Sequence, residues 1–198
     1  MRVLRLLPLL VCVGCATISK EECIQGDWYS IGVNDGQNGQ LPTDAFRGYQ
    51  KECAEFGITP DYKKYAEGHS QGLLFYCDFA HGEAHGRSGA EYNTVCTGKL
   101  EPQFRQGYQQ GLRWYQAKKV VDDIAHTIQH LQSENARLDN EIYQLNQRII
   151  QDPNANNRAS MMYRVDELRR QMASNALEIG RLDVELRRAE AAFAPLHR

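Results

Sequence analysis

The sequence predicts an all-α protein: a small, glycine-rich helical head braced by disulfides, followed by a long antiparallel helical hairpin, which is a coiled coil. Three observations predict this class. Helix-capping residues recur in the first part of the chain, where no run has the pattern of a buried strand; glycines recur there at helical spacing; and beyond residue 116 the apolar residues alternate steps of three and four. We expect a lipoprotein signal peptide over 1–14, a Cys/Gly-rich helical domain over 15–115 and the hairpin over 116–194.

The first residues have the pattern of a bacterial secretion signal. Two basic residues in MRVLR precede the apolar run LLPLLVCV, which is too short to span a bilayer, and Gly14 then precedes Cys15. This junction resembles the lipobox of bacterial lipoproteins, although Cys12 stands where that box usually has Leu. The resemblance implies acylation of Cys15, palmitate included, and Ala16 in place of Asp implies the outer membrane. The alternatives are an ordinary signal peptide cleaved elsewhere and a transmembrane anchor.

The remaining cysteines predict disulfides. An even number of cysteines in an exported chain indicates two bridges, and after Cys15 four remain: Cys23, Cys53, Cys77 and Cys96. Sequence does not choose among the three possible connectivities; we favour Cys23 with Cys53 and Cys77 with Cys96. A cysteine metal site is the alternative, but it lacks a close C-x-x-C pair. We expect no metal and no cofactor.

The head contains capping signals for four helices. The expected starts and ends are Asp27 to Gly39, Thr43 or Asp44 to Gly57, Thr59 with Pro60 to about Cys77, and a capping box of Ser88 with Glu91.

The stretch GHSQG, residues 68–72, matches the Gly-x-Ser-x-Gly pattern that presents a nucleophilic serine, here Ser70, between a strand and a helix. The preceding DYKKYAE is polar and helical in pattern, whereas such a turn requires an apolar strand. The element aromatic-x-x-Gly-x-x-x-Gly also recurs without the serine, starting at Tyr29, Tyr65 and Phe104. We therefore interpret the glycines as positions of close helix approach, because each glycine otherwise costs a helix about 1 kcal/mol against alanine. No catalytic residue is expected.

The stretch HGEAHG places His81 and His85 four residues apart, with Glu83 between them. It is not the H-E-x-x-H motif of zinc proteases. In a helix the two imidazoles could share a metal, with His69 as a third ligand. We favour the alternative, a glycine-rich polar loop with solvated histidines.

These residues carry a family resemblance. The series Trp28-Tyr29-x-x-Gly32-x-x-Asp35-Gly36-x-x-Gly39, followed by Tyr65-x-x-Gly68-x-x-x-Gly72 with cysteines nearby, resembles the uncharacterised proteobacterial envelope lipoproteins of domain-of-unknown-function family 2799. The likeness covers roughly residues 15–115, and DWYSIGVNDGQNG is its most specific element. It implies an envelope location and a small helical fold, and it implies no reaction, ligand or catalytic residue.

Two heptad seams follow the head, separated by the turn-forming run DPNANN at 152–157. A short connector implies antiparallel neighbours. If facing residues sum to 310, apolar residues meet apolar residues and Asn135 meets Asn175, whose amides can satisfy each other and fix the register. The alternatives are an arm of a larger bundle, a dimeric coiled coil, or a ligand or partner contact at these amides.

We expect a protein of unknown molecular activity that is not an enzyme: an outer-membrane lipoprotein that faces the periplasm. Its lipid binds the membrane, and its hairpin binds an envelope protein in a structural, adaptor or assembly-accessory function. Nucleic acid is not an expected partner, because 23 basic residues are balanced by 25 acidic ones and the net charge is −2. The alternative is an envelope hydrolase that uses Ser70, or a metal-binding protein that uses His81 and His85.

Overall fold

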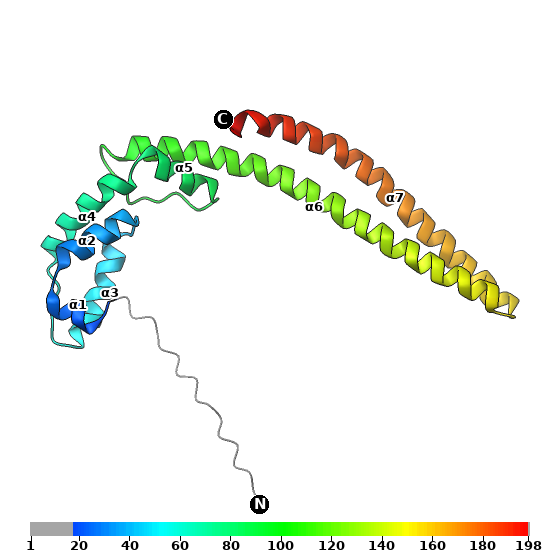
Figure 1. Cartoon of the computed structure of the whole chain (residues 1–198), viewed down its shortest axis with the longest axis horizontal. Helices are drawn as coiled ribbons and strands as arrows, with labels where there is room; N and C mark the ends of the chain where they lie inside the picture. The colour runs from blue at the N-terminus through cyan, green and yellow to red at the C-terminus, as the bar shows by residue number, and fades with distance from the viewer. Residues whose placement is uncertain (1–17, 198) are drawn as a thin grey trace, which may run out of the picture. The chain divides into compact units, whose positions relative to one another are not determined.

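The computed structural model describes residues 18–197, and over this range the chain is helical and contains no strand (Figure 1). This confirms the predicted all-α class. The signal peptide over 1–14 and the lipidation at Cys15 lie outside the described residues. Within the range that is described, no helix has both the length and the apolar character needed to cross a membrane. The helices are α1 Lys20–Gln25, α2 Trp28–Gln37, α3 Pro42–Ala54, α4 Tyr62–Tyr76, α5 Phe79–Arg87, α6 Glu101–Gln151 and α7 Ala155–Phe193, followed by a 3-10 turn at Ala194–His197.

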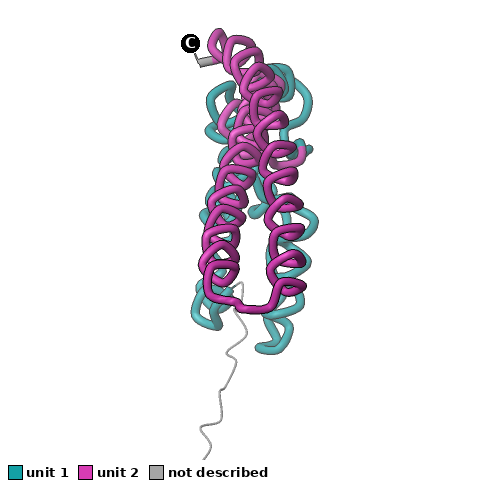
Figure 2. Tube along the Cα trace, turned by 90° about the vertical axis from the view of Figure 1, so that its right-hand side faces the viewer, with its two compact units in different colours: residues 1–82, 92–107 teal, residues 83–91, 108–198 magenta. Residues whose placement is uncertain are grey.

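The chain forms two compact units (Figure 2). Among the described residues, unit 1 comprises residues 18–82 and 92–107, and unit 2 comprises residues 83–91 and 108–197. The division falls inside both α5 and α6. The change of composition near residue 116 therefore marks no break in the backbone, because α6 runs unbroken through it.

Unit 1 contains two small cores, each built on a disulfide. Cys23 pairs with Cys53 and Cys77 with Cys96, which is the connectivity that we favoured from the sequence. A bridge closing a loop of this size contributes about 3 kcal/mol, mainly by restricting the unfolded chain. The first core gathers Ile18, Cys23, Trp28, Phe46, Tyr49, Cys53 and Tyr65, and the second Cys77, Val95, Cys96 and Phe104.

Helix α2 begins at the predicted cap, whereas α3 and α4 do not. Asp27 accepts a hydrogen bond from the backbone N–H of Ser30. Helix α3 starts earlier than predicted, at Pro42, whose fixed φ and missing N–H suit the first helical position. Helix α4 starts after Asp61 and not at Thr59, because the Asp61 side chain accepts from the backbone N–H groups of Lys63 and Lys64, the second and third residues of the helix.

No helix begins at Ser88, so the predicted capping box there is wrong. Ser88 lies just beyond the C-terminus of α5, and its hydroxyl donates to the carbonyl of His85 at 2.7 Å. Gly89 follows in the left-handed region at φ +72, which turns the chain away from the helix. The sequence signal resembled a helix start, but the serine terminates a helix instead.

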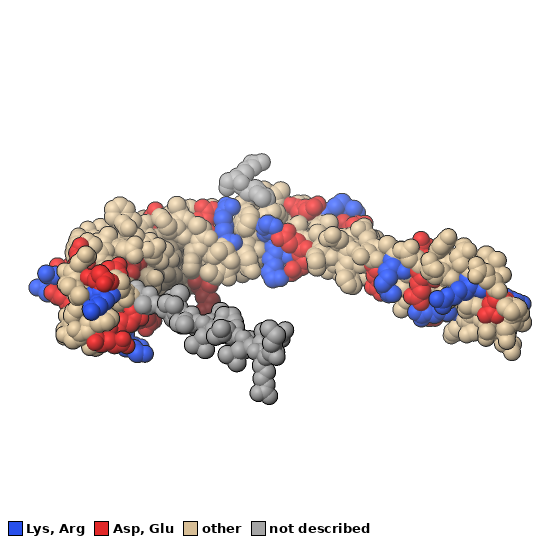
Figure 3. Space-filling view, turned by 60° about the horizontal axis from the view of Figure 1, so that its bottom comes forward, with Lys and Arg blue, Asp and Glu red and all other residues tan. Residues whose placement is uncertain are grey.

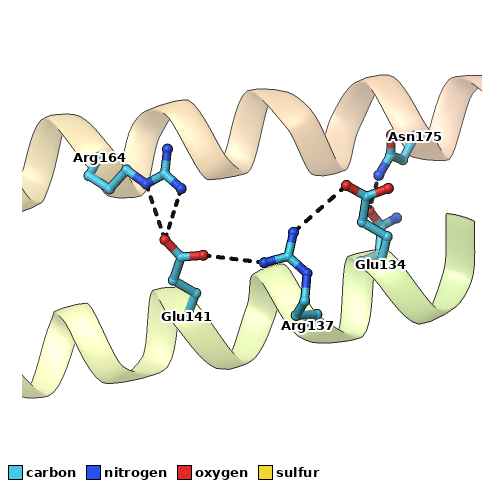
Figure 4. A network of polar contacts seen from close by, with 6 residues as sticks. Glu134, Arg137, Glu141, Arg164 and Asn175 are labelled. Carbon is cyan, nitrogen blue, oxygen red and sulfur yellow. Dashed lines mark hydrogen bonds and ion pairs between the residues drawn. The ribbon is translucent and has the colours of Figure 1, made fainter.

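In unit 2, α7 packs antiparallel on the second part of α6 through a core of Leu138, Ile142, Val165 and Leu168, with Leu145, Ile149 and Met172 against it. The connector is shorter than the predicted turn, because Asn154 caps α7 by accepting from two backbone N–H groups. Asn175 Nδ2 donates to Asn135 Oδ1 at 2.9 Å, which is the pairing expected for a register sum of 310. Nearer the hairpin turn, Arg164 donates to Glu141 across the two helices (Figure 4).

The Asn135–Asn175 pair predicts which cysteines can crosslink. Oxidation of the Asn135→Cys, Asn175→Cys double variant at low protein concentration should give an intrachain disulfide, because the two side chains already meet. The Asn135→Cys, Leu182→Cys variant is one heptad out of register and should not close. Non-reducing peptide mapping distinguishes them, and equal crosslinking of both variants, or dimers only, would contradict this register.

Candidate functional site

The glycines of α2 and α4 lock these two helices of unit 1 together. A Cβ added at Gly32 would lie closer than 3.0 Å to the carbonyl oxygen of Tyr65, and a Cβ at Gly68 would lie equally close to that of Tyr29. Gly36 and Gly72 repeat this reciprocal arrangement one turn further along both helices, against the carbonyls of His69 and Val33. Residues later in α2 contact residues later in α4, so the two helices run parallel. We call Gly32, Gly36, Gly68 and Gly72 the first glycine interlock.

The same arrangement recurs between α5 and α6. Within unit 1, Gly82 lies against the carbonyl of Phe104; within unit 2, Gly86 lies against that of Tyr108, and Gly111 against that of Glu83. We call Gly82, Gly86 and Gly111 the second glycine interlock. The segment HGEAHG is therefore part of a helix and not the polar loop that we favoured, and Phe79-x-x-Gly82-x-x-x-Gly86 is a fourth copy of the repeated element.

Contacts outside the glycines show that the two interlocks are copies of one unit. In the second helix of each copy, α4 or α6, the first glycine of the repeated element is Gly68 or Gly107. The next residue is His69 in α4 and Tyr108 in α6. Each first helix, α2 or α5, is followed by a left-handed glycine, Gly39 or Gly89. The carbonyl of the next residue accepts a hydrogen bond in both copies: Gln40 from His69 Nε2 at 2.8 Å, and Ala90 from the Tyr108 hydroxyl at 3.0 Å. Each copy also carries one disulfide. Residues 23–115 therefore contain two copies of one structural repeat.

Ser70 lies in the middle of α4, and its environment is that of an ordinary helical serine. Its side chain is exposed, and the hydroxyl donates to the carbonyl of Ala66, four residues back, at 2.8 Å. A nucleophile elbow requires a strand before the serine, and residues 18–197 contain none. The glycines on either side of Ser70 belong to the first glycine interlock, which explains the GHSQG match.

The histidines that could have shared a metal have separate partners. In unit 1, His81 Nδ1 lies 2.9 Å from Asp78 Oδ1, and the His81 backbone N–H holds the pKa of Asp78 below its usual value. In unit 2, His85 Nε2 lies 2.7 Å from the carbonyl of Glu91, and in unit 1 the buried His69 donates to a carbonyl as described above. In the part of the chain that the structure describes, no three His, Cys, Asp or Glu side chains form a group that could hold a metal.

Sequence reasoning missed a buried polar cluster in unit 1. Asp35, which is 4% exposed, accepts hydrogen bonds from the hydroxyls of Tyr49 and Tyr65, both at 2.8 Å. Burial, reinforced by the hydrogen bond to Asp35, raises the pKa of both tyrosines well above the usual range. His85 and Phe104 occupy the positions of Asp35 and Tyr65 in the second copy, so this cluster belongs to the first copy.

Because of this cluster, alkaline pH should destabilise unit 1. The pKa of a tyrosine in the unfolded chain is about 10, whereas Tyr49 and Tyr65 keep their protons in the folded state above that pH. The unfolded state then binds fewer protons, so stability is complete below about pH 10 and falls as the pH rises above it. Ultraviolet absorbance of phenolate, followed with circular dichroism, should show these two tyrosines ionising only as the head unfolds. Tyr49→Phe should remove part of the phenolate absorbance that appears only on unfolding. Replacing the exposed Tyr163 with Phe should leave that part unchanged.

The surface of the hairpin in unit 2 combines mixed charge with exposed apolar groups. Figure 3 shows basic and acidic side chains interspersed along the visible face, without a broad region of one sign. Near the hairpin turn, four large side chains are mostly exposed: Tyr143, Ile150, Met162 and Tyr163, at 59, 78, 58 and 71%. We call these four residues the tip patch. In the observed register, Met162 and Tyr163 come level with residues 148 and 147, between Tyr143 and Ile150.

The comparison with known families matches this repeated unit. The model of the family described as "Protein of unknown function (DUF2799)" matches residues 27–113. No curated protein and no solved structure matches the chain. The matched range begins at the cap of α2, ends within α6 and contains both glycine interlocks, whereas most of the hairpin lies beyond it. Residues 27–113 of this chain are therefore similar to the DUF2799 family.

Proposed function

We propose that the protein is an outer-membrane lipoprotein facing the periplasm, and that it acts as a non-enzymatic adaptor or assembly accessory for another envelope protein. The anchor in this proposal is an acylated Cys15, supported by the junction Gly14-Cys15 after a short apolar run. The disulfides Cys23–Cys53 and Cys77–Cys96 support an oxidising compartment, since such bonds are rare in reducing ones. Several acyl chains would give a stable attachment to the membrane.

The tip patch is the observation that carries the interaction role. Tyrosine and methionine are enriched in protein interfaces, and large apolar side chains left exposed at one end of the hairpin are accessible to a partner. These four side chains are not needed for the hairpin core, which is filled by the seam residues between α6 and α7. In this proposal, the tip patch binds a protein surface with an apolar centre and a polar rim.

Photocrosslinking in intact cells tests this proposal. A photoreactive amino acid at Tyr163 or Tyr143 should give one crosslinked product with an envelope protein, identified by mass spectrometry. The same group at the exposed Tyr29 of the head is the matched control and should not give that product.

A second variant links the product to the tip patch. The Ile150→Ser, Met162→Ser change should abolish the crosslink from Tyr143 without unfolding the hairpin, because both replaced side chains are mostly exposed. The proposal fails if no tip position crosslinks a protein, or if the product forms equally from Tyr29.

A further inference from the structure

Helix α7 carries a second apolar stripe, on the face turned away from α6. The stripe comprises Ala173, Leu177, Gly180 and Val184, and its steps of four, three and four are those of a helix-pairing seam. These four residues lie between the residues of α7 that pack on α6, and none of them belongs to that packed set. Leu177 is 79% exposed and Val184 42%. We call these four residues the outer stripe, and no described part of unit 2 covers it.

Gly180 distinguishes this stripe from an ordinary exposed face. The helical glycines of both interlocks admit a neighbouring backbone, whereas a Cβ added at Gly180 would meet nothing within 4 Å. Glycine inside a helix lowers its stability relative to alanine, and no contact within the chain offsets that loss here. Further along α7, at Val184 of the outer stripe, lies a shallow hollow of about 460 Å³ lined by Arg181, Val184, Glu185 and Arg188. We propose that a second copy of this chain fills this space, with the outer stripes of two α7 helices packed antiparallel.

An antiparallel pair brings every member of the outer stripe opposite another member. If facing positions sum to 357, Leu177 of one copy lies opposite Gly180 of the other, and Ala173 lies opposite Val184. Leu177, the largest and most exposed side chain of the outer stripe, then fills the space beside Gly180, which has no side chain. The two-fold axis repeats both contacts, giving four apolar layers.

The flanking charges match the same register. Residues that flank the seam meet where their numbers sum to 355 on one side and 359 on the other, two away from the facing sum. Glu167 then lies beside Arg188 of the second copy, and Arg169 beside Glu190 of the second copy, each twice by symmetry. Within residues 18–197, Arg188 and Glu190 take part in no ion pair, whereas Glu167 already pairs with Arg170 and Arg169 with Asp166. Glu167 and Arg169 would therefore each contact two partners of opposite charge in the dimer.

Where the seam continues beyond the outer stripe, one pair of like charges faces across it, Arg170 with Arg187 of the second copy. Arg170 is paired with Glu167 in its own chain at 2.8 Å, which offsets part of the repulsion. A parallel, in-register pair would instead place Asp166, Arg170 and Arg187 each opposite itself. The antiparallel arrangement therefore has the better charge complementarity.

The experiment is sedimentation equilibrium of the full mature chain in density-matched detergent, over a hundredfold range of concentration. The wild type should sediment as a dimer at the upper end. Gly180→Leu should be monomeric over the whole range with unchanged helical circular dichroism, because the new side chain has room in its own chain but occupies the place of Leu177 from the second copy. Gly180→Leu is therefore a variant that blocks pairing without unfolding the hairpin.

Charge reversal tests the register separately. Glu167→Arg or Arg188→Glu alone should weaken the dimer at least tenfold, and the double variant should restore it. A wild type that remains monomeric, a Gly180→Leu chain that still dimerises, or a double variant no better than the singles would overturn the proposal. These outcomes do not depend on the tip patch or on the acyl anchor, so they do not decide the proposed function.

Discussion

Gly36→Ala should destabilise the head by about 3 kcal/mol or more, at the upper end of the cost of overpacking. The added Cβ would meet the backbone carbonyl of His69 and the Cα of Gly72, and backbone atoms cannot move aside as a flexible side chain can. The two parallel helices would have to separate along the whole first glycine interlock. Hydrogen-exchange mass spectrometry should show lost protection over α2 and α4, with the hairpin peptides unchanged.

Gly180→Ala is the matched control, because it makes the same chemical change inside a helix. Nothing lies within 4 Å of the added Cβ, so the variant should gain about 1 kcal/mol from helix propensity in the monomeric chain. Urea unfolding measures both effects. If Gly36→Ala changed the free energy of unfolding by less than about 0.5 kcal/mol, the size of an ordinary surface substitution, the close approach of α2 and α4 would be wrong.

Asp35→Ala should cost about 4 kcal/mol. It leaves the hydroxyls of Tyr49 and Tyr65 without their acceptor in a buried site, and each unsatisfied donor costs about 1 to 3 kcal/mol, in addition to the cavity that forms. Thermal and urea unfolding of the head, followed by near-ultraviolet circular dichroism, measures this loss.

The triple variant Asp35→Leu, Tyr49→Phe, Tyr65→Phe separates hydrogen bonding from packing. It removes donors and acceptor together, and it should recover most of the stability lost in Asp35→Ala, since replacing all partners by apolar groups of similar shape is nearly neutral. If Asp35→Ala were as stable as the wild type, the buried cluster would not contribute as described. If the triple variant were less stable than Asp35→Ala, packing would outweigh the hydrogen bonds.

The sequence was most informative where the chain repeats a simple period. The two hairpin seams allow only registers that keep apolar layers together, and the single polar residue in each seam then places Asn135 opposite Asn175, as observed. Likewise, the recurring glycines identified close-packed helices, because glycine at helical spacing has little other physical use there.

The sequence was least informative where distant segments meet. It did not reveal that α2 pairs with α4 in parallel, since the pairing depends on the path of α3 between them. Asp35 was visible as an acidic residue beside an interlock glycine, yet its partner Tyr49 comes from another helix. The fourth copy of the repeat was overlooked because His81 and His85 suggested a metal site, and helical glycines at Gly82 and Gly86 resemble a loop when their neighbours are polar.

The central claim, an exported and lipid-anchored interaction protein, is tested most directly by mass spectrometry of the mature chain isolated from membranes without reduction. We expect a polypeptide that begins at Cys15, carries the mass of the acyl groups on that residue, and shows no alkylation at Cys23, Cys53, Cys77 or Cys96 until it is reduced. Cys15→Ala should remove the lipid and release the protein from the outer-membrane fraction. A mature chain with an unmodified N-terminus at another position, or free thiols among the four cysteines, would contradict the claim.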